Sequence, residues 1–145
     1  MIIQPTTLLL HLRIVGLVMA LLVAINVFVP GRFNWREELG RVSLLNRQIF
    51  QAHSICIVLM LALFAALFFT CTEALLEPTR LSRAVLIGLT IFWGLRMLMQ
   101  WFFYSPAIWR GDRFNTIAHG VFSVTWIYVT AVCAIALWAN INSVS

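Results

Sequence analysis

Charged residues are scarce in this chain, and lysine is missing altogether. The 145 residues include ten arginines and five acidic residues, and the charged fraction is 10%. A soluble globular domain has about 25% charged and about 45–50% apolar residues, whereas 62% of this chain is hydrophobic. This balance excludes a water-soluble enzyme, a disordered tail and a small secreted scaffold. It predicts a single integral membrane domain over residues 1–145.

Paired cysteines and several catalytic motifs are missing as well. Cys56, Cys71 and Cys133 lie far apart and form no C-x-x-C pair, so the motif of a dithiol redox enzyme is absent. Buried thiols that act as small hydrophobic side chains are the expected alternative. The three histidines form no H-x-x-x-H, H-x-x-H-H or H-E-x-x-H pattern, and there is no G-x-S-x-G. The sequence therefore leaves open whether the chain is an enzyme.

Long apolar runs dominate what is present. Four of them are long enough to cross a hydrocarbon core of about 30 Å, which takes roughly 20 helical residues. The strict alternation typical of a membrane β-barrel is absent, and backbone in lipid has to form its hydrogen bonds internally. We therefore expect an all-α, four-helix transmembrane bundle with up-down-up-down topology. The expected helices cover residues 8–29, 48–72, 84–104 and 116–139.

The connecting segments carry signals for helix starts. Asn34 precedes Trp35-Arg36-Glu37-Glu38 with capping-box spacing, which predicts a short helix to about Val42. The tryptophan and arginines of this helix suit the membrane interface, so we expect a short interfacial helix between the first two spans. The expected N-caps of the third and fourth spans are Thr79 or Ser82 and Asn115 or Thr116.

The arginines are unevenly distributed over the two ends of the expected bundle. Six lie in the first and third connecting segments, and three lie on the opposite side. Because basic residues are retained in the cytoplasm, we expect both termini outside a bacterial-type inner membrane and these two segments inside. Scattered arginines on so apolar a chain favour lipid headgroups over nucleic acid as partners. The two sets are Arg32, Arg36, Arg41, Arg47, Arg110 and Arg113, and Arg13, Arg80 and Arg83.

Four polar residues are expected together in the cytoplasmic half of the bundle. His53 and His119 lie about 4–5 residues into two spans of the same direction, and therefore roughly 6–8 Å inside the membrane. Arg96 and Gln100 are four positions apart and share one face of the third span. All five acidic residues lie in connecting segments, which favours an external anion, a carbonyl cluster or a bound ligand as the partner of Arg96. The alternative is that Arg96 reaches the interface or holds its span against a neighbouring helix. His11, at the opposite rim, is expected to be structural.

The two histidines suggest a cofactor. The second and fourth spans of such a bundle are diagonal and roughly 11–14 Å apart, a spacing that lets His53 and His119 approach one iron from opposite sides. We therefore predict a b-type haem with these two metal ligands in an electron-transfer subunit, with Arg96 and Gln100 completing the cofactor site. Two alternatives stay open. One is a non-catalytic accessory or assembly subunit that contacts other membrane chains, and the other is a lipid- or quinone-binding membrane protein.

Overall fold

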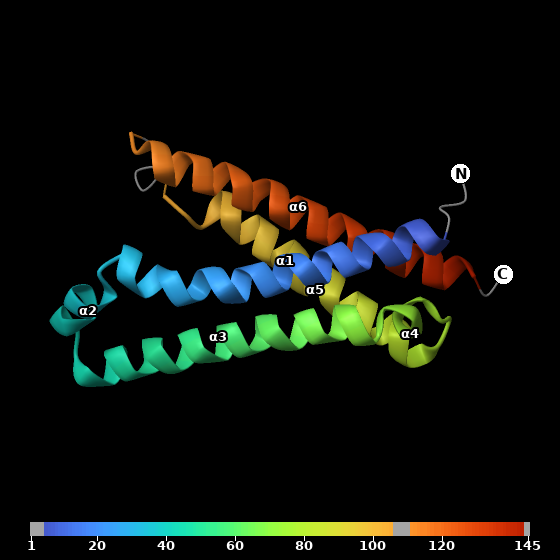
Figure 1. Ribbon diagram of the computed structural model, residues 1–145, viewed down its shortest axis with the longest axis horizontal. Coiled ribbons are helices and arrows are strands. Elements are labelled where there is room, and N and C mark those ends of the chain that lie inside the picture. The colour runs from blue at the N-terminus through green and yellow to red at the C-terminus, as the bar shows by residue number, and fades with distance from the viewer. Residues whose placement is uncertain (1–4, 106–110, 144–145) are drawn as a thin grey trace. The chain divides into compact units, whose positions relative to one another are not determined.

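The computed structural model describes residues 5–105 and 111–143, and these residues form helices and turns without a strand. Four helices are long and apolar enough to cross a membrane: α1 (Pro5–Arg32), α3 (Leu44–Thr70), α5 (Arg80–Phe102) and α6 (Arg113–Asn142). The shorter elements are α2 (Trp35–Glu38), the 3₁₀ helix η1 (Leu39–Arg41) and α4 (Thr72–Leu76) (Figure 1). The expected all-α class and the four apolar helices are confirmed. Arg110, one of the arginines used to orient the chain, lies outside the described residues.

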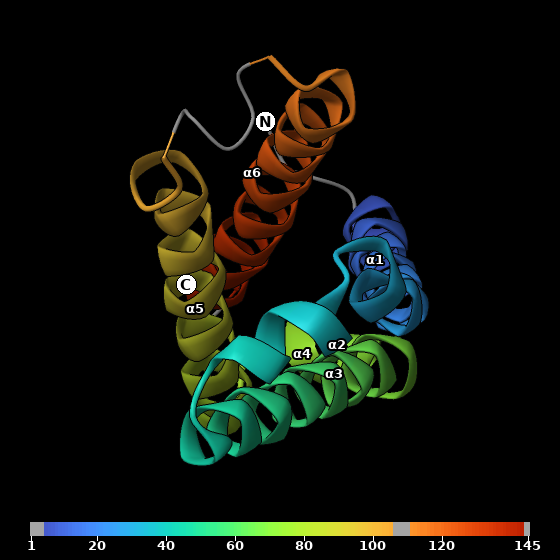
Figure 2. The same ribbon diagram turned by 90° about the vertical axis from the view of Figure 1, so that its left-hand side faces the viewer.

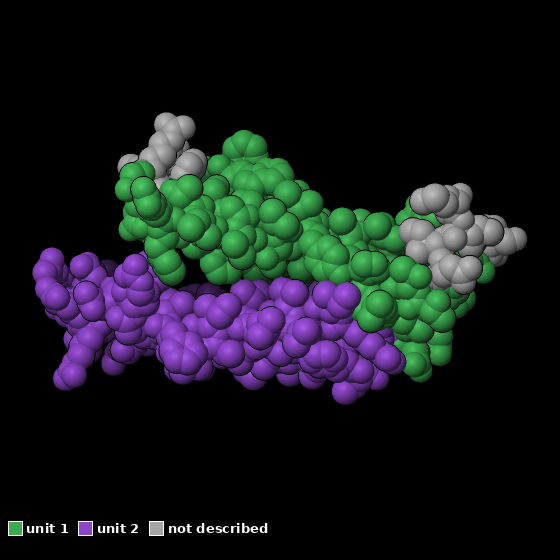
Figure 3. Space-filling model, turned by 45° about the horizontal axis from the view of Figure 1, so that its top comes forward, with its two compact units in different colours: residues 1–12, 73–145 green, residues 13–72 purple. Residues whose placement is uncertain are grey.

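The chain divides into two compact units, which Figure 3 colours differently. The first unit contains residues 1–12 and 73–145, and the second contains residues 13–72. The first therefore holds α5, α6, most of α4 and the start of α1, whereas the second holds the rest of α1 with α2, η1 and α3. Arg96, Gln100 and His119 belong to the first unit, and His53 belongs to the second.

Helices α5 and α6 of the first unit pack side by side in antiparallel directions (Figures 1 and 2). Contacts pair Ser82 with Asn140 towards one end of the two helices and Gln100 with His119 towards the other. Between them, the rings of Trp93 and Trp126 stack with their centroids 5.3 Å apart. Most of the buried residues recur at intervals of three and four, as in a coiled-coil seam. They are Ser82, Leu86, Leu89, Trp93 and Gln100 on α5, and Trp126, Val129, Val132, Cys133, Ala136 and Asn140 on α6.

In the second unit, α1 and α3 approach closely at one glycine. A Cβ atom on Gly16 would lie 3.0 Å from the Cβ of Phe68 and 3.3 Å from a ring carbon of Phe69. The absence of a side chain at this position therefore allows the two helices to pack. Near the other end of α3, Trp35 of α2 meets Phe50 edge to face, with ring centroids 4.8 Å apart.

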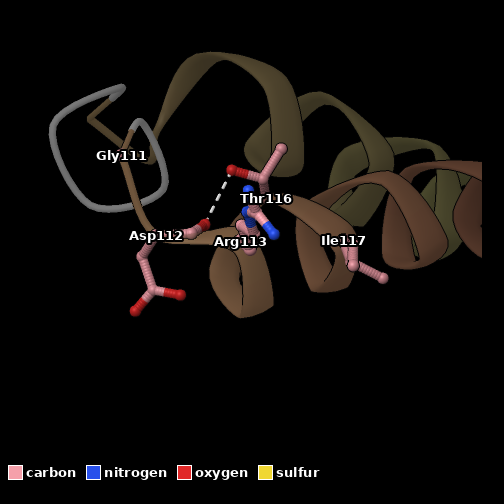
Figure 4. A pocket seen from close by; sticks show the side chains of 5 residues that line it. All are labelled: Gly111, Asp112, Arg113, Thr116 and Ile117. Carbon is pink, nitrogen blue, oxygen red and sulfur yellow. Dashed lines mark hydrogen bonds between the residues drawn. The ribbon is translucent and has the colours of Figure 1, made fainter.

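Helix α6 starts earlier than predicted because an aspartate caps it. The carboxylate of Asp112 accepts hydrogen bonds from the backbone N–H groups of Phe114 (2.8 Å) and Asn115 (3.1 Å). The negative charge of an ionised Asp at this position also interacts favourably with the positive end of the helix dipole. The prediction of Asn115 or Thr116 as the cap is therefore wrong. The Thr116 hydroxyl instead donates to the backbone carbonyl of Asp112, at 2.8 Å (Figure 4).

The other two predicted helix starts have opposite outcomes. Thr79 caps α5 in a capping box: its hydroxyl accepts from the Ser82 N–H at 3.1 Å, and the Ser82 hydroxyl accepts from the Thr79 N–H at 3.2 Å. Asn34 precedes α2 in a left-handed conformation with φ 48° and ψ 39°, and its side chain forms no cap bond. Glu37, the expected partner in that capping box, pairs with Arg41 at 2.6 Å. The short helix exists, but its predicted capping box is wrong.

The three cysteines differ in burial. Cys133 is buried in the α5–α6 seam, whereas Cys56 and Cys71 are exposed. Only 17% of the most apolar 18-residue stretch of α3 is buried, and Cys56 is one of its exposed side chains. The expectation of buried thiols therefore holds for Cys133 alone.

Candidate functional site

Three of the predicted site residues form one hydrogen-bonded chain between α5 and α6. Nη1 of Arg96 donates to Oε1 of Gln100 at 3.2 Å, and Nε2 of Gln100 lies 3.0 Å from Nδ1 of His119. Arg96 and Gln100 are one helical turn apart on α5, which places both near the first turns of α6 in this antiparallel pair. Gln100 is buried, with 5% of its surface exposed, and Arg96 and His119 are half-buried. With Trp126, these residues are called the α5–α6 polar site below.

The direction of every hydrogen bond in this chain follows from Arg96. A guanidinium group only donates, so the oxygen of the Gln100 amide faces Arg96 and its nitrogen faces His119. The amide N–H then donates to Nδ1, and a neutral His119 ring carries its hydrogen on Nε2. The reverse amide orientation would bring two donors together at Arg96. Arg96 therefore sets both the Gln100 orientation and the His119 tautomer.

An aromatic stack forms the wall beside the guanidinium. Cζ of Arg96 lies 4.7 Å from the centroid of the Trp126 ring and 5.9 Å from that of Tyr104. Trp126 stacks on Trp93 at 5.3 Å and on Phe122 at 6.0 Å, both at an interplanar angle of 11°. A cation over a buried indole gains up to about 2 kcal/mol. The stack therefore offsets part of the desolvation of Arg96 without neutralising its charge.

His53, the fourth predicted residue, lies on α3 in the second unit and has a different environment. Its side chain is exposed, and its Nδ1 lies 2.8 Å from the backbone oxygen of Ile49. A carbonyl oxygen only accepts, so Nδ1 carries a hydrogen, and in a neutral ring Nε2 is the nitrogen with the free lone pair. The pairing of His53 with His119 as axial ligands stays a prediction. Within residues 5–105 and 111–143 no three His, Cys, Asp or Glu side chains gather as a metal site, but haem iron takes only two protein ligands.

Asn140 is a buried polar residue that the sequence reasoning missed. Only 1% of its surface is exposed, and its Nδ2 lies 2.7 Å from the Glu77 oxygen, 3.0 Å from Ser82 Oγ and 3.3 Å from the Leu75 oxygen. The amide thereby joins the end of α6 to the turn between α4 and α5. A seven-residue spacing in the sequence is the signal that could have revealed it. His119, Trp126, Cys133 and Asn140 share that spacing.

Tyr128 was missed as well, and it gives His11 a partner. Nδ1 of His11 lies 2.8 Å from the Tyr128 hydroxyl oxygen, and the two rings are 5.9 Å apart. Both residues belong to the first unit, so this bond connects the start of α1 to α6. It gives a physical basis for the structural role expected of His11.

The α5–α6 polar site combines a positive charge, directed hydrogen bonds and a flat aromatic wall. All five acidic residues of the chain lie outside the four long helices, so no carboxylate within a span neutralises Arg96. Guanidinium groups bind carboxylates and phosphates through paired N–H donors, and aromatic faces accept flat or apolar groups. The chain matches no protein-family model, no curated protein and no solved structure. The chemistry of the site thus points to an acidic group on an amphipathic molecule.

Proposed function

We propose that this chain is a four-span protein of a bacterial-type inner membrane that binds the acidic group of an amphipathic ligand at the α5–α6 polar site. The observation that carries the proposal is Arg96. Its charge lies within an apolar helix and is held by Gln100 and Trp126, and the spans supply no acid for it.

The depth of Arg96 explains why an external anion is favoured. Arg96 precedes the end of α5 at Phe102 by six residues, which is about 9 Å along the helix axis. A central charge in a span costs about 2.5–3.5 kcal/mol on insertion scales, and arginines in spans pair or reach water. The amide oxygen of Gln100 and the ring faces of Trp126 and Tyr104 supply partial negative charge only. A carboxylate or phosphate oxygen would complete the neutralisation through charge-assisted hydrogen bonds.

Two ligand sources share this chemistry: the propionates of haem and the phosphate of a phospholipid. His53 supports haem, because donation of Nδ1–H to a backbone carbonyl is the usual arrangement of a metal-ligating histidine and leaves Nε2 for iron. His119 accepts at Nδ1 and so carries its hydrogen on Nε2, which means that iron ligation requires the ring to shift that hydrogen or release Gln100. The haem source therefore depends on both histidines, whereas the phospholipid source depends on neither.

The experiment is purification of the full chain from haem-replete cells in a mild detergent. An absorption spectrum detects haem, and mass spectrometry of the extract identifies acidic lipids. A Soret band lost in His53→Ala and His119→Ala but kept in His11→Ala identifies haem as the ligand. A colourless protein that carries less acidic lipid in Arg96→Leu than in Arg80→Leu identifies a phospholipid. Folded protein that carries neither ligand, or that carries as much ligand in Arg96→Leu as in Arg80→Leu, would contradict the proposal.

The proposed topology is an up-down bundle with both termini outside and the first and third connecting segments in the cytoplasm. The six-to-three distribution of arginines supports it. In this orientation the α5–α6 polar site lies in the cytoplasmic half of the membrane. Reporter fusions after Ser145 and within the segment that follows α5 test the assignment. Cytoplasmic activity of the Ser145 fusion would reverse it.

A further inference from the structure

A second cationic site lies in the second unit, where α1 ends and α3 begins. A hollow of about 630 Å³ opens there, within the range of about 300–1,000 Å³ that holds small ligands. Its lining combines charged, polar and apolar side chains from α1, α2 and α3. The residues used below are Pro30, Trp35, Arg36, Arg47, Gln51 and Ile55, and they define the loop-1 pocket.

The two arginines of the loop-1 pocket have no hydrogen-bond or ion-pair partner among the described residues. Neither the Arg36 nor the Arg47 guanidinium makes a hydrogen bond or ion pair with another residue of 5–105 or 111–143. Arg41, which lies between them in sequence, is paired with Glu37 at 2.6 Å and does not line the pocket. No acidic residue lines the pocket either. The two positive charges therefore share one hollow without a carboxylate.

The rest of the lining is suited to a molecule that is partly apolar. Trp35 is held edge to face against Phe50, with ring centroids 4.8 Å apart, and Pro30 and Ile55 add apolar surface. The exposed amide of Gln51 adds a hydrogen-bond donor. Tryptophan beside arginine is typical of segments that sit at lipid headgroups. A free phosphate would use the arginines but leave this apolar surface uncovered.

We propose that the loop-1 pocket binds the headgroup of an anionic phospholipid, with Arg36 and Arg47 donating to its phosphate and Trp35 and Ile55 contacting its apolar part. This site is separate from the α5–α6 polar site and does not depend on the function proposed for it. Each arginine near an anionic lipid surface contributes roughly a fivefold gain in affinity. Loss of both arginines is therefore expected to weaken binding by about 20–30-fold.

The test measures lipid binding by native mass spectrometry of the full chain in detergent. The probes are phosphatidylglycerol, zwitterionic phosphatidylcholine and inorganic phosphate. The double variant Arg36→Gln/Arg47→Gln is compared with Arg41→Gln/Arg80→Gln, which removes the same charge outside the pocket. We expect the first to lose about 20–30-fold in phosphatidylglycerol affinity and the second less than about threefold. Gln51→Glu, at an exposed position, is expected to lose about tenfold by placing a carboxylate in the pocket.

The outcomes separate the possible anions and the two sites. Equal losses in both double variants would show general charge attraction and overturn the proposal. Inorganic phosphate that binds as tightly as phosphatidylglycerol would assign the pocket to a free anion and also overturn it. Unchanged binding in Gln51→Glu would do the same even where the double variant fails to fold. Arg96→Leu leaves the loop-1 pocket intact, so a loss confined to that variant reports on the α5–α6 polar site instead.

Discussion

The two units of the chain differ in the hydrogen-bond partners of their polar side chains. In the second unit, four side chains of the long helices donate to carbonyls of their own helix, four residues earlier. The first unit also has such bonds, but it adds bonds that cross between elements. The own-helix pairs of the second unit are Asn26–Leu22, His53–Ile49, Ser54–Phe50 and Thr70–Ala66. The cross-element pairs of the first are Gln100–His119, Asn140–Ser82, Asn140–Glu77 and His11–Tyr128.

This difference shows two ways of satisfying polar groups among apolar helices. A hydrogen bond to the same helix satisfies the polar side chain but does not constrain the position of the neighbouring helix. A bond across helices is made at one relative position only, and so it specifies direction and register. The α5–α6 pair is specified by such bonds at both of its ends, whereas α1 and α3 are matched by shape at Gly16 and Phe68. Substitutions that remove one kind of contact but not the other test this comparison.

The largest effect is expected for Asn140→Leu. It removes a buried amide that bonds Glu77, Ser82 and Leu75. The Glu77 carbonyl keeps the Ser82 hydroxyl and the Thr79 N–H as donors, whereas the Leu75 carbonyl loses the amide. One interhelical bond in a membrane is worth about 0.6 kcal/mol and at most about 1.7, and a buried group left unpaired costs about 1–3 kcal/mol. We therefore expect a loss of about 2–4 kcal/mol in unfolding free energy.

Unfolding in mixed detergent micelles measures this loss, and Asn26→Leu in the second unit is the matched control. Among residues 5–105 and 111–143, the Asn26 side chain bonds only the Leu22 carbonyl of its own helix, and a leucine there leaves that carbonyl in its helical bond. The control is expected to change stability by less than about 0.5 kcal/mol. Similar losses in the two variants would contradict the distinction between the units.

Gly16→Ala is the corresponding test of shape in the second unit. The new Cβ would lie 3.0 Å from the Cβ of Phe68, an atom attached directly to the backbone of α3, so the helix itself has to move. Overpacking of this kind costs about 1–3 kcal/mol. Gly88→Ala on α5 is the control, since nothing lies within 4 Å of its added Cβ, and it should gain up to about 1 kcal/mol of helix propensity. Thermal unfolding in detergent compares the melting temperatures of the two variants. A higher melting temperature for Gly16→Ala than for the original chain would show that α3 moves aside without cost.

Gln100 allows stability and ligand binding to be separated. Gln100→Leu removes the bridge between Arg96 and His119 and should lower stability by about 1–2 kcal/mol. Gln100→Glu keeps an oxygen acceptor for Arg96 and adds the carboxylate that the spans lack. Its second oxygen can only accept, so the bond to His119 is kept when the ring carries a hydrogen on Nδ1. We expect it to keep the stability of the original chain but to reduce binding of an acidic ligand at least tenfold, because Arg96 is then neutralised internally. Isothermal titration with the ligand identified from the extract measures this, and unchanged binding would remove Arg96 from the binding role.

The spans and most of the α5–α6 polar site could be predicted from the sequence, whereas the environments of His53 and Asn140 could not. The four spans could be predicted from composition, because an apolar segment in lipid can pair all its backbone N–H and C=O groups by forming a helix. Depth along the chain was enough to group Arg96, Gln100 and His119, since a helix rises by a constant about 1.5 Å per residue. Depth does not report rotation, and His53 at the same expected depth makes its bond within its own helix. The seven-residue spacing places Asn140 on the same face of its span as His119, but two of its three acceptors are backbone carbonyls, and no residue type in the sequence marks a carbonyl.

The smallest effect is expected where one histidine bond crosses helices and another does not. His11→Phe keeps an aromatic ring but removes the hydrogen bond to Tyr128, which should cost about 0.6 kcal/mol, the average for such a bond in a membrane protein. His53→Phe removes a bond to the carbonyl of Ile49 in the same helix and should leave stability unchanged. The double variant His11→Phe/Tyr128→Phe should lose little more than His11→Phe alone, because the two side chains share one interaction. Additive losses in that double-mutant cycle would show that His11 and Tyr128 act independently, and the bond would then contribute nothing to the register of α1 against α6.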